Sequence, residues 1–367
     1  MFKRAEITIA CATLLGISLT QNVFATAPMD QMVPNASITN GGSNLYSIVD
    51  FMNAVNAGGD YGTGSIVYKG TTPALGGGQI GVVDILTADH VASVNNYASF
   101  IGLGAVNGII APNVYPDTLL AARGINGTED LTLVQAQIGN ITNSPAAATV
   151  YNNITPLQIA NPGPTGPGAG RATQVGASFT EYGYGDTGTA YTLAAQFGTY
   201  PAGTQGYVDS GSSFTMRFQN NIVATVNTGG PAAYTRSGNY VEPLLTWKFV
   251  APANNAFTGM SFGGDSGGPY LTSYPSNFTI NRGGNMVTGG VLTDFIDAVH
   301  VTGTSAGTVG GQILELNGDS GAGVYIDQYN AAWINNVVTG AIPEPASASL
   351  IITVAIGALA RRRRRAC

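Results

Sequence analysis

A glycine-rich segment around Ser266 holds the best candidate nucleophile of this 367-residue chain. The segment reads Gly263-Gly264-Asp265-Ser266-Gly267-Gly268-Pro269. A serine hydroxyl becomes an effective nucleophile when a neighbouring base removes its proton. The chain has two histidines, and His90, in Leu86-Thr87-Ala88-Asp89-His90, is the better candidate base. Together the two segments predict hydrolytic acyl-transfer chemistry, in which Ser266 attacks a carbonyl carbon and His90 carries the proton.

The glycines around Ser266 also predict an oxyanion hole. Because glycine adopts backbone conformations closed to other residues, a tight turn can aim the Gly264 and Ser266 amides at one developing oxyanion. Such preorganised donors are typically worth about 3 kcal/mol each in the transition state. An acid must orient His90, and Asp130 is the candidate because it heads the apolar stretch Leu131-Thr132-Leu133-Val134.

The elements that position these residues read as an antiparallel all-β body. Glycine is abundant, at 51 residues, and only 9% of residues are charged. Short apolar or alternating stretches between glycine and asparagine turns are typical of such a fold. The expected strands cover residues 65–68, 81–86, 131–134, 215–218, 245–250 and 290–293. Tyr325, Tyr329, Trp333 and Val337 predict one apolar face of a closing helix, and the Pro- and Gly-rich residues 158–171 predict a link between two β units.

Three segments, residues 86–90, 130–133 and 264–269, resemble the chymotrypsin/trypsin-like serine proteases in type and order. The segment from Gly323 to Ile334 resembles the closing strand and helix of that family. The resemblance covers residues 61–340 and implies two six-stranded antiparallel barrels with a C-terminal helix. It also implies a triad of His90 and Asp130 from the first barrel and Ser266 from the second. Polypeptides are then the expected substrates, and no cofactor is expected.

The same resemblance implies a substrate pocket with Met260 as its floor and Thr293 and Phe295 in its wall. A buried cation needs a charged partner, and Met260 supplies none. Cleavage is therefore expected after small or medium apolar residues. Asp89 departs from the family pattern, which usually has a small residue there, and no activation sequence is evident. Asp89 leaves a second hypothesis open, in which a protease-like scaffold binds at the cell surface or in a matrix without cutting.

Two other serine assignments fit the sequence less well. The serine of Gly318-Asp319-Ser320-Gly321 precedes only the closing helix, so no strands remain to build a pocket, and a loop role is expected. The pattern around Ser266 also matches that of α/β-hydrolases, which would use His300 with Asp294 or Asp297. Those acids lie too close to each other and to His300 in sequence for separate loops, and the alternating helices of that fold are absent. His300 is therefore expected to be a strand or loop histidine without a catalytic role.

The N-terminus reads as an export signal. Lys3 and Arg4 precede an apolar run, and small residues follow around Ala25. This pattern predicts a signal peptide over residues 1–25 that signal peptidase removes. The alternative is an uncleaved anchor, but the apolar run is shorter than the roughly 20 residues of a membrane span.

The C-terminal residues have the pattern of a second targeting signal. Pro343-Glu344-Pro345 precedes an apolar stretch and then five arginines, Arg361 to Arg365. This order resembles the PEP-CTERM sorting signal, here residues 341–367. The resemblance implies that an exosortase of a Gram-negative bacterium removes the tail and that the body reaches the cell surface or the outside, with no lasting membrane span. A plain C-terminal anchor is the alternative, although about 15 apolar residues are short for one.

Removal of residues 1–25 and 341–367 changes the composition of the remaining body of the protein. Cys11 and Cys367 lie in the ends, so the body is expected to lack disulfides. It would keep 7 basic and 18 acidic side chains, a net charge of −11, which repels phosphate backbones and argues against a nucleic-acid partner. No metal-ligand spacing is evident. The remaining divisions are residues 26–60, an N-terminal arm in which Asn44–Ala57 forms a short helix or a loose extension, and the protease-like domain over residues 61–340.

Overall fold

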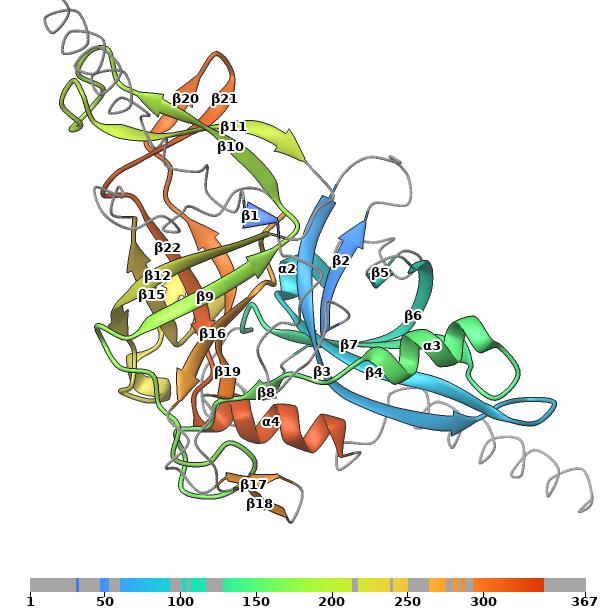
Figure 1. Ribbon diagram of the computed structural model, residues 1–367. Coiled ribbons are helices and arrows are strands. Elements are labelled where there is room, and N and C mark those ends of the chain that lie inside the picture. Colours follow the sequence, from blue (N-terminus) through green and yellow to red (C-terminus); the bar gives the residue numbers. More distant parts are fainter. Residues whose placement is uncertain are drawn as a thin grey trace, which may run out of the picture.

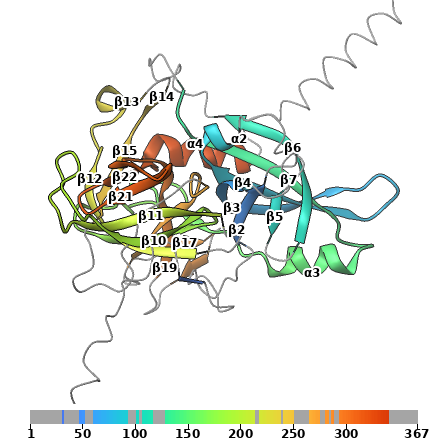
Figure 2. The same ribbon diagram turned by 90° about the horizontal axis from the view of Figure 1, so that it is seen from above.

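The computed structural model describes twelve stretches of the chain. They are residues 31–32, 47–52, 60–92, 101–103, 106–116, 128–212, 217–237, 240–249, 264–274, 280–282, 285–287 and 293–339. The signal peptide expected at 1–25, the tail expected at 341–367, and Met260 lie outside these residues. Strands dominate the described part, which forms two main β units side by side (Figure 1, Figure 2).

Six strands of the N-terminal half close into an antiparallel barrel, in the order β2-β3-β4-β7-β6-β5. Their bounds are Ile48–Met52 (β2), Asp60–Pro73 (β3), Gln79–Thr87 (β4), Ile101–Leu103 (β5), Val106–Pro116 (β6) and Thr132–Asn140 (β7). Branched aliphatic side chains such as Ile66, Ile85 and Leu133 are fully buried in its interior. This unit agrees with the expected six-stranded barrel.

Strand β2 changes the expected N-terminal boundary of the fold. Ile48 pairs with Ser65 of β3, and Asp50 pairs with Gly102 of β5, so β2 is bonded on both sides. The segment predicted as a separate arm over residues 26–60 therefore supplies a barrel strand. Within β2, the apolar side chains of Ile48, Val49 and Phe51 are buried.

The C-terminal half contains a second, larger sheet. The strands are β1 (Gln31–Met32), β8 (Gln158–Ile159), β9 (Ser178–Gly183), β12 (Arg217–Val226), β15 (Leu244–Lys248), β16 (Pro269–Tyr274), β19 (Thr293–Gly303) and β22 (Ser320–Tyr325). The order β12-β15-β22-β19-β16-β9 returns to β12, because β9 pairs with both β16 and β12. The expected second unit is thus present as a ring of six paired strands, with β1 and β8 added at its sides.

Additional strands, not expected from the sequence, surround this ring. A four-stranded sheet contains β10 (Asp186–Thr192), β11 (Gln205–Ser212), β21 (Gln312–Leu316) and β20 (Gly307–Val309), in that order. It packs a small core of its own around Leu193, Leu314 and Leu316 and lies beside the ring in Figure 1. Two hairpins complete the set, β13 (Thr235–Ser237) with β14 (Tyr240–Glu242), and β17 (Ile280–Arg282) with β18 (Asn285–Val287).

The described residues contain few helices, and all of these are short. They are α2 (Asp89–Ala92), α3 (Pro145–Asn153), α4 (Gln328–Val338) and the 3-10 turn η4 (Pro231–Ala233). The closing helix is present as α4, but it starts after Asp327, whose side chain caps its first turn. Tyr325 is buried but belongs to β22, and Tyr329 is 38% exposed, so within α4 Trp333 is the deeply buried residue of the predicted apolar face. None of the described helices is long and apolar enough to cross a membrane.

The two β units share a continuous apolar core. One cluster of buried side chains includes Ile48 and Val83 of the barrel together with Val299, Val324 and Trp333 of the second unit. Because protein interiors are packed as densely as crystals, this shared core holds the two units in a defined relation. Residues at their boundary can therefore form one site.

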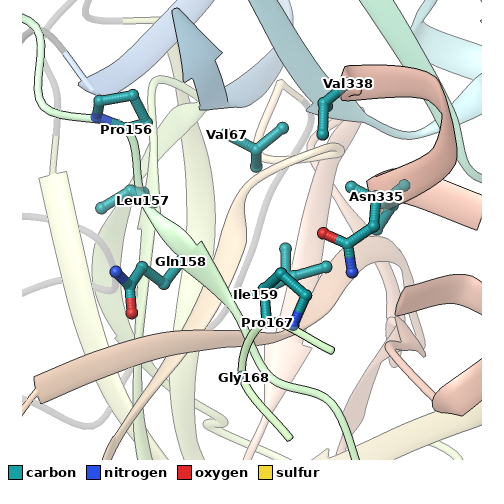
Figure 3. A pocket seen from close by; sticks show the side chains of 10 residues that line it. Val67, Pro156, Leu157, Gln158, Ile159, Pro167, Gly168, Asn335 and Val338 are labelled. Carbon is teal, nitrogen blue, oxygen red and sulfur yellow. The ribbon is translucent and has the colours of Figure 1, made fainter. Parts of the chain in front are cut away.

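The link between the units runs past a cavity of about 360 Å³ (Figure 3). Its wall consists of barrel, link and α4 residues, namely Val67, Pro156, Leu157, Gln158, Ile159, Pro167, Gly168, Ile334, Asn335 and Val338. None of these is a predicted site residue. The expected link over residues 158–171 is mostly irregular, and its first residues form β8, which pairs with β19.

Candidate active site

Asp130 holds His90 with both of its carboxylate oxygens. Oδ2 accepts from His90 Nδ1 at 2.6 Å, and Oδ1 accepts the His90 backbone N–H at 2.8 Å. The Asp130 side chain is 6% exposed, whereas that of His90 is 39% exposed. Because a carboxylate only accepts, Nδ1 carries the proton, which leaves Nε2 as the basic nitrogen. Nε2 is therefore the atom that can take a proton from a substrate or a nucleophile.

Strand pairing explains how residues 40 positions apart in sequence meet. Thr87 at the end of β4 lies opposite Thr132 at the start of β7. Since the strands are antiparallel, the chain leaving β4 and the chain entering β7 lie at the same edge of the barrel. His90 lies on the single turn α2 directly after β4, and Asp130 lies two residues before β7. In both views α2 lies at the boundary between the two β units (Figure 1, Figure 2).

The loop that carries Ser266 is fastened to both units. The carbonyl oxygens of Ser266 and Gly264 accept from the amide and hydroxyl of Thr63, in the barrel strand β3, at 2.7 and 3.0 Å. On the other side, the Gly267 amide donates to the His300 carbonyl in β19 at 2.7 Å. Gly264 and Gly267 have φ values of 93° and 88°, which other residues rarely adopt. Two of the glycines expected to shape this turn, Gly264 and Gly267, therefore have the backbone conformation that favours glycine.

Gly62 shows how near Ser266 lies to the turn that carries His90. A Cβ atom built on Gly62 would lie 2.6 Å from the side chain of Val91 and 2.8 Å from the carbonyl oxygen of Ser266. The residue after His90 and the backbone of Ser266 therefore contact the same point of β3. Within the described residues no hydrogen bond joins Ser266 Oγ to His90. Such catalytic bonds are often long before substrate binds.

The backbone amides of the turn around Ser266 differ in their hydrogen bonding. In the described part of the chain, Gly267 and Gly268 donate to His300 and Asp265, while the Gly264 and Ser266 amides donate to no protein group. These two are the amides that the sequence predicts as oxyanion donors. The hydrogen-bonding pattern is compatible with that role, which stays a prediction.

The side chain of Asp265 helps to hold the turn around Ser266 in place. Its side chain is fully buried, and Oδ1 accepts the backbone N–H of Gly185 at 2.9 Å. Gly185 lies between β9 and β10, and a Cβ atom there would lie 2.5 Å from that oxygen. Only glycine leaves room for this contact. The carboxylate preceding the candidate nucleophile thus has an internal partner.

A second buried carboxyl, that of Glu242, lies next to the His90–Asp130 pair. The sequence analysis does not predict it. Its Oε2 accepts the Asp130 amide at 3.1 Å, and the residue is 2% exposed. The pKa of Glu242 is raised to about 7, chiefly because burial disfavours the charged carboxylate; the bond from the Asp130 amide and the His90 charge oppose this rise, and the Asp130 charge adds to it. No local pattern around residue 242 signals this contact, because it forms between two β units.

Asp89 and Tyr240 flank the pair. The Tyr240 hydroxyl donates to Asp89 Oδ2 at 3.4 Å. Burial raises the pKa of Asp89, and the neighbouring Asp130 charge raises it further. The residue that departs from the family pattern is therefore half-buried beside the candidate base, with a tyrosine partner.

The residues predicted to line a substrate pocket are placed as follows. Thr293 is the first residue of β19 and pairs with Tyr274. Phe295 is fully buried, packs with Ala160, and has the Arg171 guanidinium 5.0 Å from its ring centre. With Met260 outside the described residues, the pocket stays a prediction.

The rival serine and histidine have structural partners. Ser320 begins β22, and its amide donates to Thr304 Oγ1 at 2.8 Å. His300 is buried in β19, with Nδ1 2.6 Å from the Tyr270 hydroxyl and 3.3 Å from Glu181. Burial lowers the pKa of His300 to about 3, which keeps the imidazole neutral. Among the described residues, no group of three His, Cys, Asp or Glu side chains is arranged to hold a metal ion.

Comparison with known proteins gives little further information. No family model matches the chain, and no curated protein matches it. Among solved structures, the chain is similar to neuropsin, a serine protease expressed in the limbic system of mouse brain. The identity is 13%, the TM-score is 0.43, and the match covers 80% of this chain and 94% of that one. The function proposed below therefore rests on the site itself.

The turn around Ser266 predicts a steric test. In Gly267→Ala, the new Cβ would collide with the Thr63 carbonyl oxygen and with Thr87 Oγ1 at a positive φ. We expect the free energy of unfolding to fall by about 2–4 kcal/mol. The control is Gly176→Ala, which has the same φ of 88° but nothing within 4 Å of the new atom, and should cost about 1 kcal/mol. Urea denaturation measures both, and equal losses would contradict the packing described here.

Glu242 predicts a pH dependence of stability. Its pKa of about 7 in the folded protein lies above the unfolded value, so the folded state binds more protons between about pH 4.5 and 7. The stability of the wild type therefore falls as pH rises through this window, and Glu242→Gln lacks this loss. We expect the variant to gain about 2 kcal/mol over the wild type between pH 5 and 8, measured by urea denaturation. A difference that does not vary with pH would show that Glu242 titrates normally.

Proposed function

We propose that this protein is a serine endopeptidase that uses His90, Asp130 and Ser266 to hydrolyse peptide bonds. The observation that carries the proposal is the pairing of a buried carboxylate with a half-exposed histidine at the boundary of two β units. The glycine-rich turn with Ser266 contacts the same barrel strand as the turn with His90. The two β units with a closing helix agree with the trypsin-like architecture that the three motifs resemble.

The mechanism follows from the atoms that each residue presents. His90 Nε2 takes the proton from Ser266 Oγ as that oxygen forms a bond to the carbonyl carbon of the substrate. The Asp130 carboxylate stabilises the imidazolium that results. The Gly264 and Ser266 amides donate to the oxyanion of the tetrahedral intermediate. His90 then protonates the leaving amine, and a water molecule, deprotonated by the same nitrogen, hydrolyses the acyl-enzyme.

The proposed preference is for small or medium apolar residues before the cleaved bond. Met260 would form the floor of the pocket, with Thr293 and Phe295 in its wall. A methionine floor has no charge to pair with a lysine or arginine side chain. The substrates are accordingly polypeptides rather than nucleic acids, which the acidic body would repel.

The proposed destination is the cell surface or the outside of a Gram-negative bacterium. The support is the order of elements at each end, a signal peptide over residues 1–25 and a PEP-CTERM-like tail over residues 341–367. Signal peptidase and an exosortase would act on the chain during export. The mature body would then carry no lasting membrane span.

A binding protein on the same scaffold is the second candidate. The observation that favours it is Asp89, which lies half-buried beside His90 with a raised pKa. A further acid next to the base could hold the imidazole in an unproductive state. Chemical labelling of the nucleophile separates the two functions.

The labelling experiment uses a fluorophosphonate probe on the purified protein. The wild type should be labelled stoichiometrically, because the probe reacts with serine only when a base activates it. Ser266→Ala and His90→Ala should abolish labelling and reduce casein cleavage by at least about 1,000-fold. Ser320→Ala is the control and should label like the wild type. A folded wild type that does not react would favour the binding protein.

Digestion of a peptide library tests the specificity. Cleavage should follow alanine, valine, leucine or similar residues, because the proposed pocket floor is uncharged. Mass spectrometry of the products identifies each cleaved bond. Products that end mainly in arginine or lysine would overturn the assignment of Met260 as the floor.

The mass of the exported protein tests the processing. A chain recovered from the surface or medium of a producing cell should begin near Thr26 and should lack the arginine cluster Arg361 to Arg365, since both ends are expected to be removed. Intact-mass and terminal-peptide measurements give both ends. A protein that keeps residues 341–367 in the membrane would support a plain anchor.

A further inference from the structure

A hairpin of the second unit reaches the catalytic acid of the first. Thr128 forms a bridge with Tyr240, and the Val241 amide donates to the Thr128 carbonyl at 2.9 Å. One residue further along, Glu242 Oε2 accepts the amide of Asp130 at 3.1 Å. The β13–β14 hairpin is therefore bonded to the segment that leads into Asp130, 112 residues away in sequence.

This contact adds a bond to those that orient His90. The Asp130 side chain holds the amide and the Nδ1 atom of His90, and the Asp130 amide is held in turn by Glu242. The chain of bonds runs from Glu242 through Asp130 to the base. Ser266 also belongs to the second unit, so Glu242 ties the histidine and its acid to the unit that provides the nucleophile.

Charged and titratable groups surround Glu242 from each neighbouring element. Asp130 and His90 face it from the barrel, and both affect its ionisation. Tyr240 lies on the same strand and is affected by the Glu242 charge. Arg236 lies on β13, opposite Val241, and the buried Glu129 directly precedes Asp130. Glu242 is thus a second carboxyl in electrostatic contact with the proposed proton-carrying pair.

We propose that Glu242 is a positioning residue for the triad, which holds Asp130, and through it His90, across the boundary of the two units. The inference rests on the function proposed above. The carboxyl oxygen of Glu242 accepts the Asp130 amide, and the side-chain oxygen of a glutamine can accept the same bond. Glu242→Gln therefore keeps the acceptor, whereas Glu242→Ala removes it.

Hydrogen exchange at the Asp130 amide tests the positioning without any need for activity. The measurement uses the full protein with Ser266→Ala, which prevents self-digestion. In Glu242→Ala the Asp130 amide should exchange at least about tenfold faster, because its acceptor is gone. In Glu242→Gln the rate should stay within about threefold of the starting protein, since the amide oxygen still accepts.

Kinetics on the chain with Ser266 intact test the effect on the proposed reaction. Glu242→Ala should lower kcat about tenfold with KM within about twofold, because orientation is lost while substrate binding is kept. Glu242→Gln should recover most of kcat.

The matched control is Glu315→Gln. Glu315 is also a buried glutamate with a raised pKa, but it lies in the four-stranded sheet and contacts neither His90 nor Asp130. Its variant should reproduce the wild-type rates. Unchanged Asp130 exchange in Glu242→Ala, or a kcat of Glu242→Gln as low as that of Glu242→Ala, would overturn the proposal. A wild type without labelling would refute the proposed function, and the exchange rates would still decide whether Glu242 holds Asp130.

Discussion

The carboxylate of Asp130 is the group on which the site depends. Both of its oxygens bind one residue, His90, and the side chain is nearly inaccessible to water. A buried carboxylate is costly unless hydrogen bonds replace its hydration. The same two bonds that offset this cost fix the position and the tautomer of the imidazole. The same two hydrogen bonds therefore stabilise the buried carboxylate and orient the imidazole. The exposed side of His90 stays free of these bonds.

The rest of the fold brings the candidate nucleophile, Ser266, to the same boundary between the two units. Pairing of β4 with β7 places the histidine and its acid at one edge of the barrel. The turn with Ser266 is held between Thr63 of the barrel and His300 of the second unit, and glycines provide the φ values that this path requires. The apolar core shared by both units fixes the positions of these residues relative to one another. A boundary between two rigid units thus provides the precision that a loop alone would lack.

Part of this arrangement could be predicted from the sequence. Alternating stretches predict strands, and β3, β4, β7 and β15 overlap the expected segments. Because histidine is scarce, the sequence indicates His90 as the candidate base. The position of Asp130 before an apolar strand indicates it as the acid that orients His90. Strand β2 was missed because five apolar-rich residues fit a helix as well as a strand until a partner is known. The four-stranded sheet depends on pairing between β11 and β21, which are far apart in sequence.

Glu242 shows why the rest of the site could not be predicted from the sequence. Its neighbours Val241 and Pro243 give no sign of a functional residue, and the contact with Asp130 exists only once both units have folded. The resemblance to a known family implies a triad of His90, Asp130 and Ser266, but it implies nothing about Glu242. A crystal structure of the protein bound to a peptidyl boronic acid tests the central claim most directly. It should show boron bonded to Ser266 Oγ, with His90 Nε2 within about 3 Å and the Gly264 and Ser266 amides donating to a boronate oxygen. Boron bonded elsewhere, or an imidazole remote from Ser266, would contradict the account.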